Sequence, residues 1–282
     1  AFSANAQFSV TYQDSDPGLP NFQHVSADAS GNSYYTGTFN DSVHLGSVTI
    51  YKMATAGVQG TGYFVAKMDA GGNWVWGKSI PVMDGSGYGG LNISNVAADN
   101  SGNVFITGWY KGSMTFGSTT IQSGPTANNT SLFVGKINSN GDFLWVVNTS
   151  GKAGFMDTWG RSLATDATGN VYVTGKLGVK SGTPTIYAIY WAKISPSGVK
   201  LWENTLAPAS NSWASSFTQV DNTGYEIVVD GSSNVYVTGT FHGSVKFANG
   251  SGNTIASTNP AAFTTKLNSS GVVQWVRSAT PS

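Results

Sequence analysis

The chain has no cysteine and few charged residues, and both shortages narrow the choice of protein class. Among its 282 residues, Lys and Arg together number 14 and Asp and Glu together number 14, so the formal net charge is zero. A chain without cysteine has no disulfides, thiolate nucleophiles or thiolate metal sites. Because no basic stripe is present to release counterions from a phosphate backbone, we expect no nucleic-acid partner.

Long apolar runs are also missing, and no stretch approaches the roughly 20 residues that a membrane span requires. Glycine and aromatic residues are abundant instead, with 36 Gly, 9 Trp, 12 Tyr and 14 Phe. This composition favours short strands joined by turns over helices.

The first residues have the features of a processed terminus. Residues 4–6, Ala-Asn-Ala, show the small-x-small pattern after which signal peptidase cuts. We therefore expect residues 1–6 to be a signal-peptide remnant and residues 7–282 to form a single domain. The protein is expected to be secreted or displayed at the cell surface.

One ten-residue pattern occurs four times along the chain. It reads DASGNSYYTG from Asp28, DNSGNVFITG from Asp99, DATGNVYVTG from Asp166 and DGSSNVYVTG from Asp230. Each copy is followed by a variable stretch and then by a second shared segment, such as FVGKINSNGDFLW from Phe133. Four copies of one active site would be unusual, whereas repetition of one structural unit is common.

Each repeat contains four short runs rich in β-branched and aromatic residues, which predicts four antiparallel strands separated by turns. In the second repeat we expect these strands at residues 96–98, 104–107, 131–137 and 142–148. The Asp-x-x-Gly-Asn element has the chemistry of a tight turn, because Asp bonds to nearby backbone amides while Gly and Asn tolerate positive φ. Ser233 replaces this Gly in the fourth copy and is expected to strain its turn slightly.

Repeats longer than about 40 residues with four strands each are typical of propeller blades. The sequence therefore predicts an all-β fold, a β-propeller with four blades of four antiparallel strands plus an extra N-terminal strand; a five-bladed propeller with one degenerate blade is the alternative. The extra strand is placed within residues 7–13, because residues 5–10 align loosely with residues 140–145. The expected blades span residues 22–80, 93–150, 161–206 and 224–279.

Two further residue types recur in every repeat. We expect the tryptophans of the last strands to pack between blades, because indole rings bury a large apolar area. The recurring lysines either pair with the turn aspartates of their own blade or are solvated. The tryptophans are Trp76, Trp145, Trp202 and Trp275, and the lysines are Lys67, Lys136, Lys193 and Lys266.

The shared pattern, D-x-x-G-N-V-Y-V-T-G followed by F-V-A-K and a last-strand Trp, resembles the bacterial β-propeller repeat called SBBP. The likeness is close in residues 99–108 and 166–175, looser in the first copy, and extends from residue 24 to 279. This resemblance implies a propeller fold in surface and secreted proteins, and it implies no single activity.

Binding is expected on the propeller face that carries the longer connections, because variable loops on a rigid scaffold often hold functional residues. This face is expected to include residues 14–22, 84–91, 156–161 and 209–225. Tryptophans outside the shared pattern lie in or beside these polar loops, where they suit stacking on sugar rings; alternatively they fill the channel or cover blade edges. The candidate ligand-binding residues are Tyr88, Trp109, Tyr110, Asp157, Trp159, Arg161, Trp213 and Asp221.

The preferred functional hypothesis is a non-catalytic protein that recognises a carbohydrate through this face. A protein-binding scaffold or adhesion module of a surface assembly is the first alternative, with edge-strand pairing through residues 7–13. A glycan-cleaving enzyme is the second, because glycosidases need two suitably separated carboxylates. Its candidate acids are Asp84, Asp157, Asp221 and Glu226.

Other chemistries find less support in the sequence. The 3 histidines lie far apart along the chain, and no Gly-x-Ser-x-Gly elbow or His-Glu-x-x-His motif is present. No cofactor is expected. Bound calcium is the alternative, because Asp14, Asp16 and Asp84 supply oxygen ligands in short polar loops.

Overall fold

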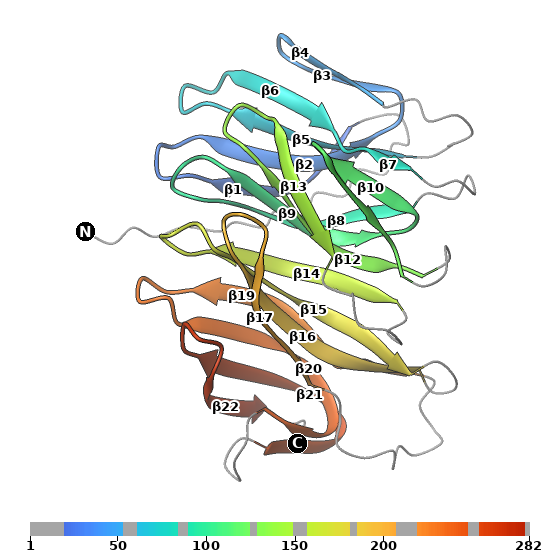
Figure 1. Cartoon of the computed structure of the whole chain (residues 1–282), viewed down its shortest axis with the longest axis vertical. Coiled ribbons are helices and arrows are strands. Elements are labelled where there is room, and N and C mark those ends of the chain that lie inside the picture. The colour runs from blue at the N-terminus through green and yellow to red at the C-terminus, as the bar shows by residue number, and fades with distance from the viewer. Residues whose placement is uncertain are drawn as a thin grey trace.

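The computed structural model describes residues 20–52, 61–83, 90–124, 129–148, 157–180, 185–206, 219–247 and 254–279. These residues form strands and turns (Figure 1), and among them no helix is long and apolar enough to cross a membrane. The suspected signal-peptide remnant and the extra strand expected within residues 7–13 lie outside the described residues.

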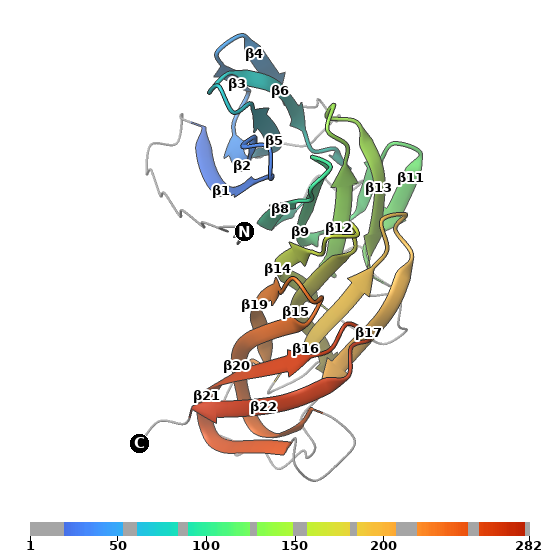
Figure 2. The ribbon, with the colours of Figure 1, turned by 90° about the vertical axis from the view of Figure 1, so that its left-hand side faces the viewer.

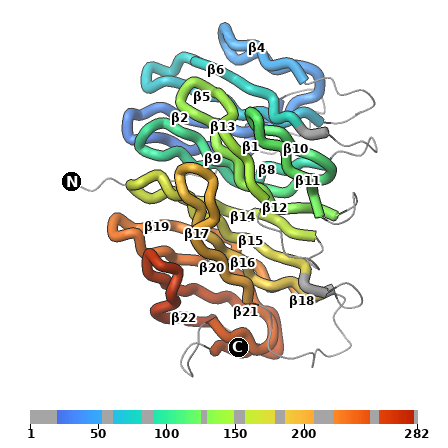
Figure 3. The backbone as a smooth tube through the Cα atoms, viewed as in Figure 1, coloured from blue at the N-terminus to red at the C-terminus, as the bar shows by residue number. Residues whose placement is uncertain are grey.

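Four antiparallel sheets follow one another along the chain, each with four strands in a single hydrogen-bonded path. The first contains β1 (Asn21–Ala27), β2 (Ser33–Phe39), β5 (Gly62–Met68) and β6 (Trp74–Ser79). The second contains β8 (Leu91–Ala98), β9 (Val104–Tyr110), β12 (Ser131–Ile137) and β13 (Phe143–Asn148). The third contains β14 (Thr158–Thr165), β15 (Val171–Lys180), β16 (Thr185–Ile194) and β17 (Lys200–Leu206), with the short β18 (Gln219–Val220) parallel to β16. Figure 3 follows the chain through the sheets. The fourth contains β19 (Thr223–Val229), β20 (Val235–Lys246), β21 (Thr254–Leu267) and β22 (Val273–Ala279). The all-β class and the repeated four-stranded unit are confirmed.

The sheets pack on one another through their first strands. Strand β1 contacts β8, β8 contacts β14, and β14 contacts β19. In Figure 2 the sheets follow a curved row with these first strands toward its inner side. Among the described strands, no comparable packing joins the fourth sheet to the first, so the row is open.

The connection between the second and third strands is a hairpin in the first two repeats, where the sequence predicted variable loops. These hairpins pair β3 (Ser42–Leu45) with β4 (Val48–Tyr51), and β10 (Ser113–Phe116) with β11 (Thr119–Gln122); β10 also pairs with β7 (Val82–Met83). Each hairpin folds back on the last strand of its sheet, β4 on β6 and β10 with β11 on β13. Alternating apolar residues drive this packing, because the hairpins bury Val43, Leu45, Met114 and Phe116.

The repeated aspartate organises the first turn of every sheet, as predicted. Asp166 Oδ1 accepts hydrogen bonds from the backbone amides of Thr168 and Asn170, both at 3.0 Å. Its Oδ2 accepts from Asn170 Nδ2 at 2.8 Å and from the hydroxyl of Tyr172 at 3.0 Å. The same pair of amide bonds is made by Asp28, Asp99 and Asp230.

We expect Ser233→Gly to raise the free energy of unfolding by about 0.5–1 kcal/mol, because Ser233 has a left-handed backbone that disfavours a Cβ atom. Its φ is 59°, whereas Gly31, Gly102 and Gly169 fill the same position at 80°, 72° and 79°. Urea denaturation followed by tryptophan fluorescence measures the change. Ser232→Gly is the matched control, and it should be neutral or destabilising because it relieves no positive φ. A stabilisation shared by both variants would show that relief of the positive φ is not its cause.

The recurring tryptophans lie between sheets, as predicted, in each junction that the structure describes. In three of the four repeats, the indole Nε1 donates to a backbone carbonyl in the last turn of the following sheet. These bonds run from Trp76 to Ser139 at 2.9 Å, from Trp145 to Pro196 at 3.0 Å and from Trp202 to Ser269 at 3.3 Å.

The recurring lysines lie mainly over aromatic rings. The expected ion pair with a turn aspartate is seen for Lys193, whose Nζ is 3.6 Å from Asp166 Oδ2. In all four repeats the lysine faces the aromatic residue opposite it on the second strand, an arrangement that favours cation–π attraction. The Nζ-to-ring distances are 5.6 Å for Lys67 and Tyr34, 5.3 Å for Lys136 and Phe105, 4.9 Å for Lys193 and Tyr172, and 5.3 Å for Lys266 and Tyr236.

Candidate functional site

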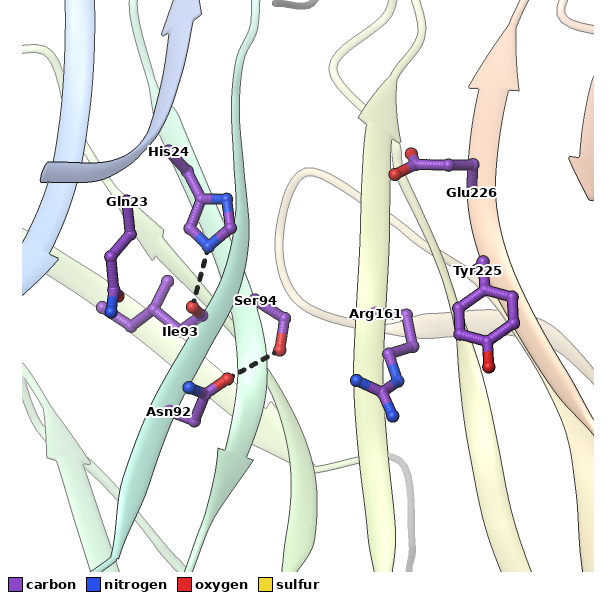
Figure 4. A pocket seen from close by; sticks show the side chains of 8 residues that line it. All are labelled: Gln23, His24, Asn92, Ile93, Ser94, Arg161, Tyr225 and Glu226. Atoms are coloured by element: carbon purple, nitrogen blue, oxygen red, sulfur yellow. Dashed lines mark hydrogen bonds between the residues drawn. The ribbon is translucent and has the colours of Figure 1, made fainter. Parts of the chain in front are cut away.

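A pocket of about 340 Å³ lies where the first strands of all four sheets converge. Figure 4 shows its side chains coming from β1, β8, β14 and β19. Polar groups predominate among them. The lining residues are Gln23, His24, Asn92, Ile93, Ser94, Arg161, Tyr225 and Glu226.

A β-bulge in each first strand aims one residue into this pocket. The register shifts between Phe22 and His24, between Ile93 and Asn95, between Gly160 and Ser162, and between Gly224 and Glu226. A bulge leaves one residue unpaired and changes the direction of its side chain. The four bulged residues are Gln23, Ser94, Arg161 and Tyr225, and all four line the pocket.

The glycine that ends the repeated ten-residue pattern makes room for this bulge. A Cβ atom at Gly108 would collide with the backbone carbonyl of Asn92, and one at Gly175 with that of Trp159. The equivalent Gly37 and Gly239 are constrained in the same way. Only glycine permits such an approach of one backbone to another, so the shared glycine of the sequence follows from the shape of the pocket wall.

Arg161 provides the positive charge of the pocket. In Figure 4 it lies between Ser94 and Tyr225, and its Cζ is 5.8 Å from the centroid of the Tyr225 ring. Its Nε is buried and has no hydrogen-bond partner among the described residues. A buried donor without a partner is unfavourable, and Arg161, which carries this donor, lines the pocket.

Glu226 and His24 are held in defined orientations. Ser162 Oγ donates to Glu226 Oε2 at 2.8 Å, which ties the carboxylate of β19 to β14. Burial lowers the pKa of His24, although its bond to Ile93 acts in the opposite direction, so the ring is neutral near pH 7. His24 Nε2 lies 3.0 Å from the carbonyl oxygen of Ile93 and must donate to it, which leaves Nδ1 as an acceptor.

Two of the residues predicted to bind a ligand, Trp159 and Asp221, contact a buried lysine instead. Lys176 Nζ is 2.8 Å from Asp221 Oδ1 and lies 4.7 Å and 4.2 Å from the ring centroids of Trp159 and Tyr187. Burial lowers the pKa of Lys176, and the hydrogen bond and charge of Asp221 oppose that shift. Asp157, another of the predicted residues, accepts from the backbone N and the hydroxyl of Thr130 at 2.8 Å and 3.0 Å. Both carboxylates, Asp221 and Asp157, therefore bond to groups of their own chain.

The other predicted site residues are dispersed. Tyr110 is fully buried, and its hydroxyl accepts from Asn148 Nδ2 at 3.2 Å. Trp109 is half-buried beside Gly90, and neither Trp109 nor Trp159 is among the described residues that line the pocket. The remaining predicted ligand residues, Tyr88 and Trp213, lie outside the described residues.

Metal ligands do not gather in the described part of the chain. No group of three or more His, Asp or Glu residues there could hold a metal ion. The candidate calcium ligands Asp14, Asp16 and Asp84 fall outside the described residues.

No protein-family model matches the chain, and no curated protein matches it. Solved structures do match. A protein of unknown function from Bacteroides caccae is 10% identical with a TM-score of 0.38, the match covering 92% of this chain and 82% of that one. A gluconolactonase from Xanthomonas campestris is 10% identical with a TM-score of 0.37, the match covering 93% of this chain and 63% of that one. Likenesses at these scores carry no information on what this chain binds.

Proposed function

We propose that the four sheets are consecutive blades of a β-propeller and that the pocket on their first strands binds a carbohydrate without cleaving it. Propeller blades surround a central channel. The contribution of one bulged residue from each of the four sheets to one pocket supports this arrangement. The site proposed here is therefore on the inner strands, and not on the long loops where the sequence pattern predicted it.

The chemistry of the lining suits a sugar. Gln23 and Asn92 carry amides, Ser94 a hydroxyl and His24 an imidazole acceptor, so donors and acceptors are both present. Tyr225 adds an exposed aromatic ring. A sugar offers hydroxyls to the polar groups and C–H faces to the ring, which matches a pocket with a few fixed polar groups. The position of Arg161 in the lining is the single observation that carries the proposal most strongly, because the N–H groups of its guanidinium can donate to a ligand oxygen.

Binding is favoured over cleavage by the number of acids. Glycoside hydrolysis ordinarily uses two carboxylates that flank the scissile bond. Among the described residues that line the pocket, Glu226 is the one carboxylate, and it already accepts a hydrogen bond from Ser162.

Arg161→Met is expected to weaken oligosaccharide binding about tenfold or more, because hydrogen bonds to a charged group contribute about 1.5–3 kcal/mol and 1.4 kcal/mol is tenfold in affinity. A glycan array containing neutral and acidic sugars identifies a ligand, and calorimetry with that ligand measures the loss. Methionine keeps the apolar length of the side chain, so the fold should be preserved.

Lys246→Met is the matched control, since it removes one positive charge from an exposed residue of β20 that does not line the pocket. Its affinity should equal that of the wild type. Trp159→Ala distinguishes a site in the pocket on the first strands from a site on the loop face that the sequence predicted. A ligand lost with Trp159→Ala and retained with Arg161→Met would place binding on the loop face and overturn this proposal, as would an array without any glycan signal.

A further inference from the structure

The contact that joins consecutive sheets has two halves, and three complete copies of it occur within the chain. One half is the last-strand tryptophan, which donates to a carbonyl of the next sheet. The other half is the turn between the third and fourth strands of that next sheet, whose glycine lies against the indole. Cβ atoms built at Gly141, Gly198 and Gly271 would lie 2.9 Å, 3.0 Å and 2.9 Å from Cδ2 of Trp76, Trp145 and Trp202, respectively.

The first sheet carries the acceptor half without a tryptophan on it. Gly72 occupies the same turn position with the same backbone, at φ 83° against 86° for Gly141. A Cβ at Gly72 would have no described atom within 4 Å. Gly72 is exposed, whereas Gly141 is buried. Ala70, which is also exposed, stands where Ser139 offers its carbonyl in the second sheet.

The fourth sheet carries the donor half without a turn beneath it. Trp275 occupies the recurring position on β22 and is partly exposed. Among the described residues, its indole has no carbonyl acceptor like those of the other three tryptophans. A second contact differs in the same way. The hydroxyl of Tyr34 in the first sheet donates to Asp28 and also lies 3.2 Å from Gly102 O of the second sheet, whereas its counterpart Tyr236 bonds to Asp230 and has no such carbonyl of another sheet beside it among the described residues.

We propose that the fourth sheet of one copy docks on the first sheet of a second copy through this same contact. Trp275 would lie over Gly72 of the second copy and donate to the carbonyl of its Ala70. The interface would continue one that the chain already makes three times. Such a contact joins two different surfaces and closes into a ring when it is made reciprocally. Two copies of four sheets match the upper end of the roughly four-to-eight-blade range of propellers.

A second copy fits the open turn better than the chain's own N-terminal segment. The residue of that segment that aligns with Trp145 is Val10, which has no N–H donor on its side chain and no ring to cover the glycine. Trp275 is the one recurring tryptophan that has no turn against it among the described residues. In a closed dimer it would contact the turn at Gly72, which is the one turn of this kind without a tryptophan against it among those residues.

Gly72→Asn and Trp275→Ala test the two halves separately. Asparagine tolerates positive φ, and the space around Gly72 is open, so this variant should fold while its Cβ blocks the incoming indole. We expect the wild-type chain to sediment as a dimer in analytical ultracentrifugation and each variant alone to sediment as a monomer. An equimolar mixture should regain a dimer, because Gly72→Asn keeps an intact tryptophan half and Trp275→Ala keeps an intact turn half.

Two control chains test whether the dimer depends on this contact alone. Tyr51→Ala, at a strongly exposed residue of β4, should remain a dimer, and so should the chain without residues 1–13. A wild-type chain that is monomeric at the highest concentration reached would overturn the proposal. So would a mixture that stays monomeric, or a dimer that is lost on removing residues 1–13 and kept in both point variants.

Discussion

Trp76→Ala is expected to lower the free energy of unfolding by about 3–5 kcal/mol, the usual range when a large buried aromatic side chain is removed. The side chain of Trp76 is 7% exposed and covers Gly141 of the second sheet. The substitution leaves a cavity at the junction and deprives the carbonyl of Ser139 of its donor. Urea denaturation followed by circular dichroism measures the loss.

Trp275→Ala is the matched control, because Trp275 has the same position in its repeat and, among the described residues, no following sheet. Both substitutions are best made in the Gly72→Asn background, so that self-association does not contribute. There we expect Trp275→Ala to lower the free energy of unfolding by about 1–2 kcal/mol. The loss is smaller because Trp275 is already partly exposed in the folded chain, so its removal takes away less buried apolar area. Equal losses at the two positions would show that junction packing is not what Trp76 contributes.

Strand positions could be predicted where a short run rich in apolar residues is bounded by turn residues. The third strand of the second repeat was expected at residues 131–137, and β12 spans Ser131–Ile137. The first strand was expected at residues 96–98, whereas β8 begins at Leu91. The bulge at Ser94 breaks the alternation there, and polar residues face the pocket, so the pattern that marks a half-buried strand is lost.

The hairpins show a second limit of the sequence pattern. Residues 42–45 and 48–51 differ between repeats and were interpreted as part of a variable connection. Their alternation of buried Val43 and Leu45 with exposed residues is too short to separate a four-residue strand from a loop. Contact with β6 stabilises the hairpin, and a contact between distant segments is not visible in local periodicity.

The site was predicted in part. Arg161 was a candidate ligand residue and Glu226 a candidate acid, and both line the pocket. Gln23, Ser94 and Tyr225 were missed, although a signal was present. Each lies five residues before the aspartate of its repeat, at a position that varies among polar side chains, as does the residue that follows it. Without knowledge of the bulge, this variation resembles that of any solvated position.

Asp166→Ala is expected to lower the free energy of unfolding by about 3–5 kcal/mol, the range for removing one partner of a buried charged pair. The Asp166 side chain is 2% exposed, and Lys193 lies 3.6 Å from it. Its removal leaves the amide of Asn170 and the buried hydroxyl of Tyr172 without their acceptor. Asp230→Ala is the control, because Asp230 bonds to its turn in the same way but is more exposed, and its loss should be smaller.

The difference in free energy of unfolding between wild type and Asp166→Ala should also depend on pH, and it should shrink at acidic pH. Burial acts to raise the pKa of Asp166, but hydrogen bonds from Asn170, Thr168 and Tyr172 outweigh it, so the pKa in the folded state is lowered. As the pH falls, the Asp166 carboxylate is protonated in the unfolded chain at about pH 3.9, and in the folded chain only at a lower pH. The stabilisation that Asp166 contributes is therefore complete above about pH 3.9 and is lost as the pH falls through the folded-state pKa. Urea denaturation should therefore give the same difference in free energy of unfolding between wild type and variant at pH 7 and pH 5, and a smaller difference at pH 3. A difference in free energy of unfolding that increases on acidification would mean that these hydrogen bonds do not stabilise the carboxylate.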